Sequence, residues 1–166
     1  MREAFGLIYI GSAILSPCGK YRYRLERQAD PFGSGSVNFI MLNPSTADAT
    51  VDDPTIRRCV GFAKSWGYAR LIVTNLFAFR ATDPGELRGK TSAEIVGPDN
   101  DRHLIDASNE ADRIVCAWGA GGGIYGRDNY VRLMLAKKPL AALKLTKHGH
   151  PQHPLYIPAN TSPVAF

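Results

Sequence analysis

The sequence predicts an α/β protein: a three-layer sandwich with a central four-stranded parallel sheet and an N-terminal antiparallel hairpin. Within residues 37–145, short apolar stretches alternate with stretches of helical spacing, which is typical of βαβ units. The apolar stretches read as strands that are buried on both faces. Residues 5–16 and 20–27, in contrast, are two strand-like stretches joined by the turn sequence Ser-Pro-Cys-Gly, as in a hairpin.

The length and composition indicate an ordinary globular domain. A chain of 166 residues with 45% hydrophobic and 21% charged residues can bury a sizeable core, so we expect a single domain over residues 1–166. Within it, residues 1–36 form the hairpin and a connector, and residues 37–158 form the core. No apolar run approaches the roughly 20 residues that cross a bilayer. We therefore expect no membrane association, and the three widely spaced cysteines favour a reducing cytoplasm.

The core elements follow in regular order. Asp53 and Pro54 suit the start of a helix, as N-cap and first helical residue. In the hairpin, Tyr and Leu alternate with Arg and Glu over residues 20–27, which predicts one buried and one charged face. Strands are expected at residues 37–42, 70–74, 113–118 and 140–145, helices at 54–66, 98–111 and 127–137, and loops at 78–97 and after 145, with a helical turn at 84–88.

If these strands are parallel, their carboxyl ends meet at one edge of the sheet, where ligands bind in open α/β folds. Four loops would then gather there, at residues 43–53, 75–84, 119–126 and 146–156. We expect Asn43, Asn75, Trp118 and His153 to line one cleft at this edge, although they are scattered along the chain.

The first loop offers Asn43, Ser45 and Asp48. An Asn at a strand end can orient a water molecule or a ligand amide, and a nearby Asp can accept a proton. Alternatively, Asn43 and Ser45 satisfy the backbone of a turn. For Asp53 we favour a role as helix cap only.

Two further candidates follow the second core strand. The side chain of Asn75 has both a donor and an acceptor, which suits the edge of a nucleobase, although a capping role fits equally well. Arg80 can hold a phosphate or a surface carboxylate, and the second is commoner.

Glycines and histidines mark the last two loops. The backbone at Gly121, Gly122 and Gly123 can cradle a phosphate, or the glycines can simply permit a close turn. Three histidines share the loop after residue 147, with poor spacing for zinc, so we expect no metal site there. His153, which is fixed by the following Pro154, is our candidate for stabilising an anion.

The net charge of +5 comes entirely from residues 129–166, which contain five Lys and Arg and no Asp or Glu. Lys144 and Lys147 are therefore candidates for phosphate contacts with a nucleic acid or a nucleotide. A solvated basic surface is the equally weighted alternative.

Four stretches of the sequence resemble a bacterial and phage family classed as a domain of unknown function. The stretches are MLNPSTADATVDDPTIRRC, VTNLFAFRATDP, VCAWG and GHPQHPLY, and the resemblance spans roughly residues 20–157.

The order of motifs also looks like the uracil-DNA glycosylase superfamily. This resemblance implies a fold with a four-stranded parallel sheet between helices. It implies that Asn43 positions water, that Asn75 reads the base, that the Trp118-Gly119 pair lies at the substrate, and that His153 stabilises the departing base. Ser45 and Leu155 depart from the superfamily pattern, which has Gly and Ser at these places.

Our leading hypothesis is an enzyme that cleaves an N-glycosidic bond or otherwise processes a nucleobase or nucleotide, with Asp48 as possible general base and no metal or redox cofactor. One alternative is a non-catalytic nucleic-acid or nucleotide binder on the same fold. Another is a metal-dependent hydrolase that uses Asp48, Asp52 and His153.

Overall fold

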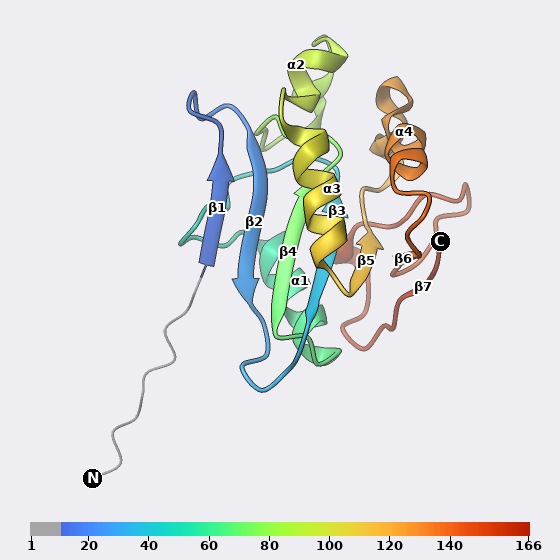
Figure 1. Ribbon diagram of the computed structural model, residues 1–166. Helices are drawn as coiled ribbons and strands as arrows, with labels where there is room; N and C mark the ends of the chain where they lie inside the picture. Colours follow the sequence, from blue (N-terminus) through green and yellow to red (C-terminus); the bar gives the residue numbers. More distant parts are fainter. Residues whose placement is uncertain (1–10) are drawn as a thin grey trace.

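The computed structural model describes residues 11–166 and has the α/β class that the sequence predicts. Its sheet has seven strands in the order β1-β2-β4-β3-β5-β6-β7 (Figure 1). The strands are β1 (Gly11–Leu15), β2 (Arg22–Gln28), β3 (Ser36–Met41), β4 (Arg70–Asn75), β5 (Arg113–Cys116), β6 (Leu140–Ala142) and β7 (Val164–Ala165). The expected hairpin strand at residues 5–16 lies in part outside the described residues.

The sheet is mixed. Parallel ladders join β4 to β3, β3 to β5, and β5 to β6. Antiparallel strands extend it on both sides, because β2 pairs with β4, β1 pairs with β2, and β7 pairs with β6. The hairpin is therefore part of the sheet, and the C-terminal tail, for which no strand was predicted, adds β7.

Helices cover both faces of the sheet (Figure 1). Helix α1 packs on one face, where Phe62 and Ile56 meet Phe39. Helices α3 and α4 pack on the other, where Leu104 and Val131 join Ile40. The helices are α1 (Pro54–Ser65), α2 (Ser92–Val96), α3 (Asn100–Glu110) and α4 (Arg127–Met134), and short 3-10 turns are η1 (Pro84–Leu87), η2 (Ala120–Gly126) and η3 (Pro154–Tyr156).

Two local predictions were wrong in detail. The predicted strand at 140–145 ends at Ala142, because the chain turns there and Leu145 forms only an isolated bridge with Pro151. The predicted loop at 78–97 contains helix α2, whose start carries a capping box formed by Thr91 and Glu94.

The predicted charged face of β2, which consists of Arg22, Arg24 and Glu26, is also wrong, since both arginines are buried and Glu26 is half-buried. The register of β1 against β2 shifts between Ile14 and Leu15, which interrupts the simple alternation on which the prediction relied. Arg22 and Arg27 donate hydrogen bonds to backbone carbonyls of the loop at residues 42–53. This loop therefore folds over β2 and shields it from solvent.

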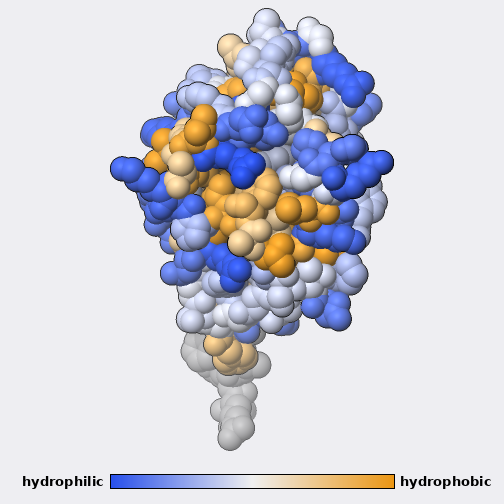
Figure 2. Space-filling model, turned by 90° about the vertical axis from the view of Figure 1, so that its right-hand side faces the viewer, coloured by the Kyte–Doolittle hydropathy of each residue, from blue (hydrophilic) through white to orange (hydrophobic). Residues whose placement is uncertain are grey.

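The C-terminal part of the chain contributes apolar as well as basic side chains to the surface. Figure 2 shows a face on which hydrophobic residues gather between hydrophilic ones. Leu133, Tyr156 and Val164 are exposed in this part, together with Lys144 and Lys147. Among residues 11–166, no helix has the length and apolar character needed to cross a membrane.

Candidate functional site

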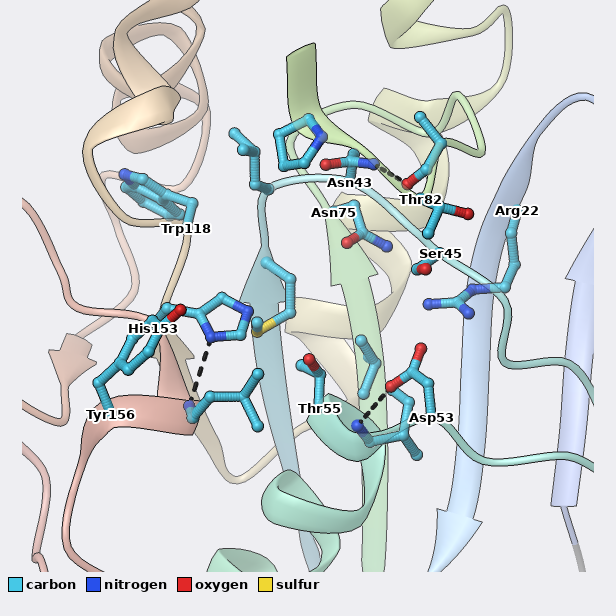
Figure 3. A pocket seen from close by; sticks show the side chains of 17 residues that line it. Arg22, Asn43, Ser45, Asp53, Thr55, Asn75, Thr82, Trp118, His153 and Tyr156 are labelled. Carbon is cyan, nitrogen blue, oxygen red and sulfur yellow. Dashed lines mark hydrogen bonds between the residues drawn. The ribbon is translucent and has the colours of Figure 1, made fainter. Parts of the chain in front are cut away.

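A cavity of about 460 Å³ opens where β3, β4 and β5 end (Figure 3). Its volume lies within the ~300–1,000 Å³ of pockets that enclose whole small-molecule ligands. Polar side chains and apolar side chains both line it. They are Arg22, Met41, Leu42, Asn43, Ser45, Asp53, Thr55, Ile56, Val73, Asn75, Ala81, Thr82, Pro84, Trp118, His153, Leu155 and Tyr156.

The structure brings Asn43, Asn75, Trp118 and His153 together at this cavity, as the argument from strand ends expects. Ser45 lies there too. Asn43 follows β3, Asn75 ends β4, and Trp118 follows β5, so the parallel ladders carry all three to one edge. The roles assigned to these residues remain predictions.

Asn75 is the most unusual of the lining residues. It is 1% exposed, yet neither its Nδ2 nor its Oδ1 has a hydrogen-bond partner in the described part of the chain. Its backbone carbonyl, in contrast, accepts a 2.9 Å hydrogen bond from Nδ2 of Asn100, which also donates to the carbonyl of Leu76. The backbone is held in place while the amide is presented, unpaired, to the cavity (Figure 3). An unpaired buried amide costs about 1–3 kcal/mol, which a matching ligand would recover.

His153 presents one ring nitrogen to the cavity. Its Nδ1 accepts a 3.3 Å hydrogen bond from the Leu155 backbone N–H, so the proton of the neutral ring belongs on Nε2, which points toward the cavity (Figure 3). Burial lowers the pKa of His153, against a smaller opposing effect of the Asp53 charge. His153 is thus a neutral hydrogen-bond donor at pH 7.

Asn43 combines the two roles considered for it. Its Nδ2 donates hydrogen bonds to the carbonyls of Pro44 (3.1 Å) and Ala81 (2.9 Å), which ties the loop after β3 to the segment after β4. Its Oδ1 is left to accept from a ligand or a water molecule. The turn-forming interpretation is therefore correct for the nitrogen and does not exclude a binding role for the oxygen.

Two charged residues at the cavity were missed by sequence reasoning. Asp53 caps α1 through a 2.9 Å hydrogen bond from the Ile56 N–H to Oδ1, as predicted, but it also lines the cavity. Arg22 is 2% exposed, and its burial lowers its pKa to about 10. Its place in an alternating strand suggested an exposed side chain, and the sequence carried no signal that a loop would cover it.

Asp48 does not line the cavity, so it does not stand where a general base would act. Its carboxylate accepts hydrogen bonds from the backbone N–H groups of Thr50 (2.9 Å) and Val51 (2.8 Å). These bonds lower the pKa of Asp48 and mark it as the cap of a turn. Asp52 pairs with Arg27 at 2.7 Å, away from His153, and among residues 11–166 no three His, Cys, Asp or Glu side chains are grouped as metal ligands.

The remaining candidates for phosphate or substrate contacts lie outside the cavity lining: Arg80, Gly119, Gly121, Gly122, Gly123, Lys144 and Lys147. The N–H of Gly119 donates to the Pro151 carbonyl at 2.7 Å. A Cβ on Gly122 would collide with Cδ1 of Trp118, and one on Gly121 would lie 2.9 Å from Cδ2 of Leu42. These two glycines permit η2 to pack closely behind the cavity wall, in line with the close-turn interpretation.

The fold and the cavity together define an α/β protein with a partly polar cavity at the carboxyl edge of its sheet. The chain belongs to the family described as "Protein of unknown function (DUF1643)", whose model matches residues 22–155. This confirms the expected membership of an uncharacterised family. No curated protein and no solved structure matches the chain.

The packing of η2 predicts different effects on stability when each of two neighbouring glycines is replaced by alanine. Gly122→Ala should destabilise the protein by about 1–3 kcal/mol, because its Cβ collides with the Trp118 ring. Gly123→Ala is the matched control, since a Cβ there meets nothing within 4 Å. Denaturant unfolding measures both, and equal stabilities of the two variants would contradict the packing account.

Replacing the Asn75 amide should separate stability from binding. Asn75→Leu removes two unpaired buried polar atoms, so the free energy of unfolding should stay unchanged or rise by about 1 kcal/mol. Asn100→Leu should lower it by about 1–3 kcal/mol, because the carbonyls of Asn75 and Leu76 lose their donor. A loss of more than 2 kcal/mol in Asn75→Leu would show that this amide has a structural role.

Proposed function

We propose that this protein hydrolyses the N-glycosidic bond of a nucleobase-bearing substrate. The observation that carries the proposal is the unpaired amide of Asn75, held at 1% exposure in a cavity that His153 also lines. An amide that is fixed and lacks protein partners suits a ligand edge with one donor and one acceptor side by side. Nucleobases have such edges.

His153 would support the departing base. When the bond between the sugar C1′ and the base nitrogen breaks, the electron pair goes to the base, which develops negative charge. The neutral imidazole can donate its Nε2–H to that charge. Because Nδ1 is held by the Leu155 N–H, the ring is oriented before the substrate arrives.

Water attack at C1′ requires a proton acceptor. We assign this role of general base to Asp53 rather than to Asp48. One oxygen of the Asp53 carboxylate is held by the Ile56 N–H. The other faces the cavity (Figure 3) and can accept the proton of the attacking water. The Oδ1 of Asn43 can orient that water. The order of Asn43, Asn75, Trp118 and His153 along the chain also resembles that of the uracil-DNA glycosylase superfamily, which supports the same proposal.

The test is release of free base from a substrate panel. Oligonucleotides with different damaged bases, free nucleosides and nucleoside monophosphates are incubated with the protein, and free base and abasic sites are measured. We expect release from at least one substrate, and a fall in kcat/KM of about 100-fold or more in His153→Ala and in Asn75→Leu. His148→Ala is the matched control, because His148 is exposed and does not line the cavity.

Binding without release of base from any member of the panel would contradict hydrolysis. That result would favour the non-catalytic nucleotide binder, for which the cavity would serve equally well.

The pH dependence follows from the lowered pKa of His153. The value in the folded protein lies below the ordinary 6.5, so the ring is neutral above pH 6.5 and becomes charged only as the pH falls below this value. Protonation of Nδ1 would remove the acceptor of the Leu155 N–H and disturb the site. We expect kcat/KM to be flat from pH 6.5 to 8 and to fall below 6.5, and activity that rises toward pH 5 would contradict a neutral His153.

A further inference from the structure

We propose that the cavity takes a free nucleotide whose phosphate binds to Arg22. This inference rests on the proposed function and names its substrate class: a nucleoside monophosphate rather than a base presented by a nucleic-acid strand.

Arg22 differs from the other buried arginines. Arg24 pairs with Glu26 and Glu110, Arg27 pairs with Asp52 at 2.7 Å, and Arg127 pairs with Asp101 at 2.5 Å. Within residues 11–166, Arg22 has no carboxylate within 4.0 Å, although it is 2% exposed.

The guanidinium of Arg22 is only partly engaged. Its Nη1 donates a 2.7 Å hydrogen bond to the Ala47 carbonyl, which anchors the side chain to the loop after β3. Its Nε has no partner among the described residues, and no protein group accepts from Nη2 there. Nε and Nη2 form one edge of the guanidinium, the fork that binds two oxygens of a phosphate or carboxylate.

A buried positive charge without a paired anion is costly, and the carboxylates that act on Arg22 are not in contact with it. The charges of Asp53 and Asp48 raise the pKa of Arg22, but neither forms an ion pair with it, and Oδ1 of Asp53 is used by the Ile56 N–H. A ligand anion that enters the cavity would therefore form the ion pair that Arg22 lacks in the ligand-free protein. Arg22 extends toward Ser45 in Figure 3, so a hydroxyl donor for the same anion stands beside it.

The position of Arg22 favours a free small-molecule ligand over a base that is part of a nucleic-acid strand. A base flipped out of a nucleic acid enters a pocket while its phosphates stay on the backbone outside. Here the cation lies inside the cavity, on the same lining as Asn75 and His153. The cavity of about 460 Å³ is large enough for a whole small molecule. Lys144 and Lys147, which were expected to contact the phosphates of a nucleic acid, lie outside it.

The experiment compares affinities by titration calorimetry of the full chain. The ligands are the common nucleoside 5′-monophosphates, the matching nucleosides, and short oligonucleotides of the same base. We expect at least one monophosphate to bind about tenfold or more tightly than its nucleoside, the contribution of a charged hydrogen bond. Arg22→Gln should abolish this preference and leave nucleoside affinity within about twofold, while Arg88→Gln, an exposed arginine outside the cavity, should retain it.

A second measurement needs no folded Arg22 variant. Inorganic phosphate should raise the Tm of the wild-type protein above that in chloride at equal ionic strength, and should compete with the monophosphate. Equal affinity for nucleoside and monophosphate, no effect of phosphate, or tighter binding of the oligonucleotide than of the monophosphate would each overturn the inference.

The two proposals fail separately. Base release from oligonucleotides without any preference for a monophosphate would support the proposed hydrolysis and overturn the role of Arg22. A preference for the monophosphate that depends on Arg22, without release of base, would support the phosphate site and overturn the hydrolysis.

Discussion

The site depends on the parallel ladders that hold β3 between β4 and β5. Ile40 is in register with Thr74 on one side and Cys116 on the other, so the three strands end at the same level. Asn43 and Trp118, which follow β3 and β5, and Asn75, which ends β4, therefore all reach the same edge of the sheet. The hydrogen bond from Asn43 to the Ala81 carbonyl then fixes the loop after β3. Strand direction thus brings three of the candidate side chains to one edge, and loops and helix ends complete the cavity.

Within residues 11–166, six buried side-chain atoms lack a hydrogen-bond partner, and four of them belong to residues that line this cavity: Arg22, Asn75 and Trp118. Asn100 lies at the same edge and is fully buried, but its Nδ2 serves two backbone carbonyls. In Asn75, by contrast, both amide atoms lack a partner, as does Nε of Arg22. Buried polar groups that lack partners are uncommon in proteins, and their concentration around one cavity is what a binding site requires before its ligand arrives.

The sequence predicted the α/β class and the convergence of Asn43, Asn75, Trp118 and His153, because both follow from strand periodicity and direction. It did not predict which polar atoms remain unpaired, since that depends on three-dimensional contacts. Asp48 looked like a better base than Asp53, yet Asp48 caps a turn and Asp53 lines the cavity. Arg22 looked exposed, and only the loop that folds over β2 buries it.

The central claim is that the unpaired side-chain amide of Asn75 forms hydrogen bonds with the edge of a ligand. Nuclear magnetic resonance of the ¹⁵N-labelled protein reports on it directly, with the Nδ2 signals assigned by their absence in Asn75→Leu. Titration with the nucleobase, nucleoside or nucleotide that binds should shift both Asn75 side-chain proton signals and slow their exchange with water, while those of the already bonded Asn100 change little. Saturation with such a ligand that leaves the Asn75 signals unmoved would contradict the account.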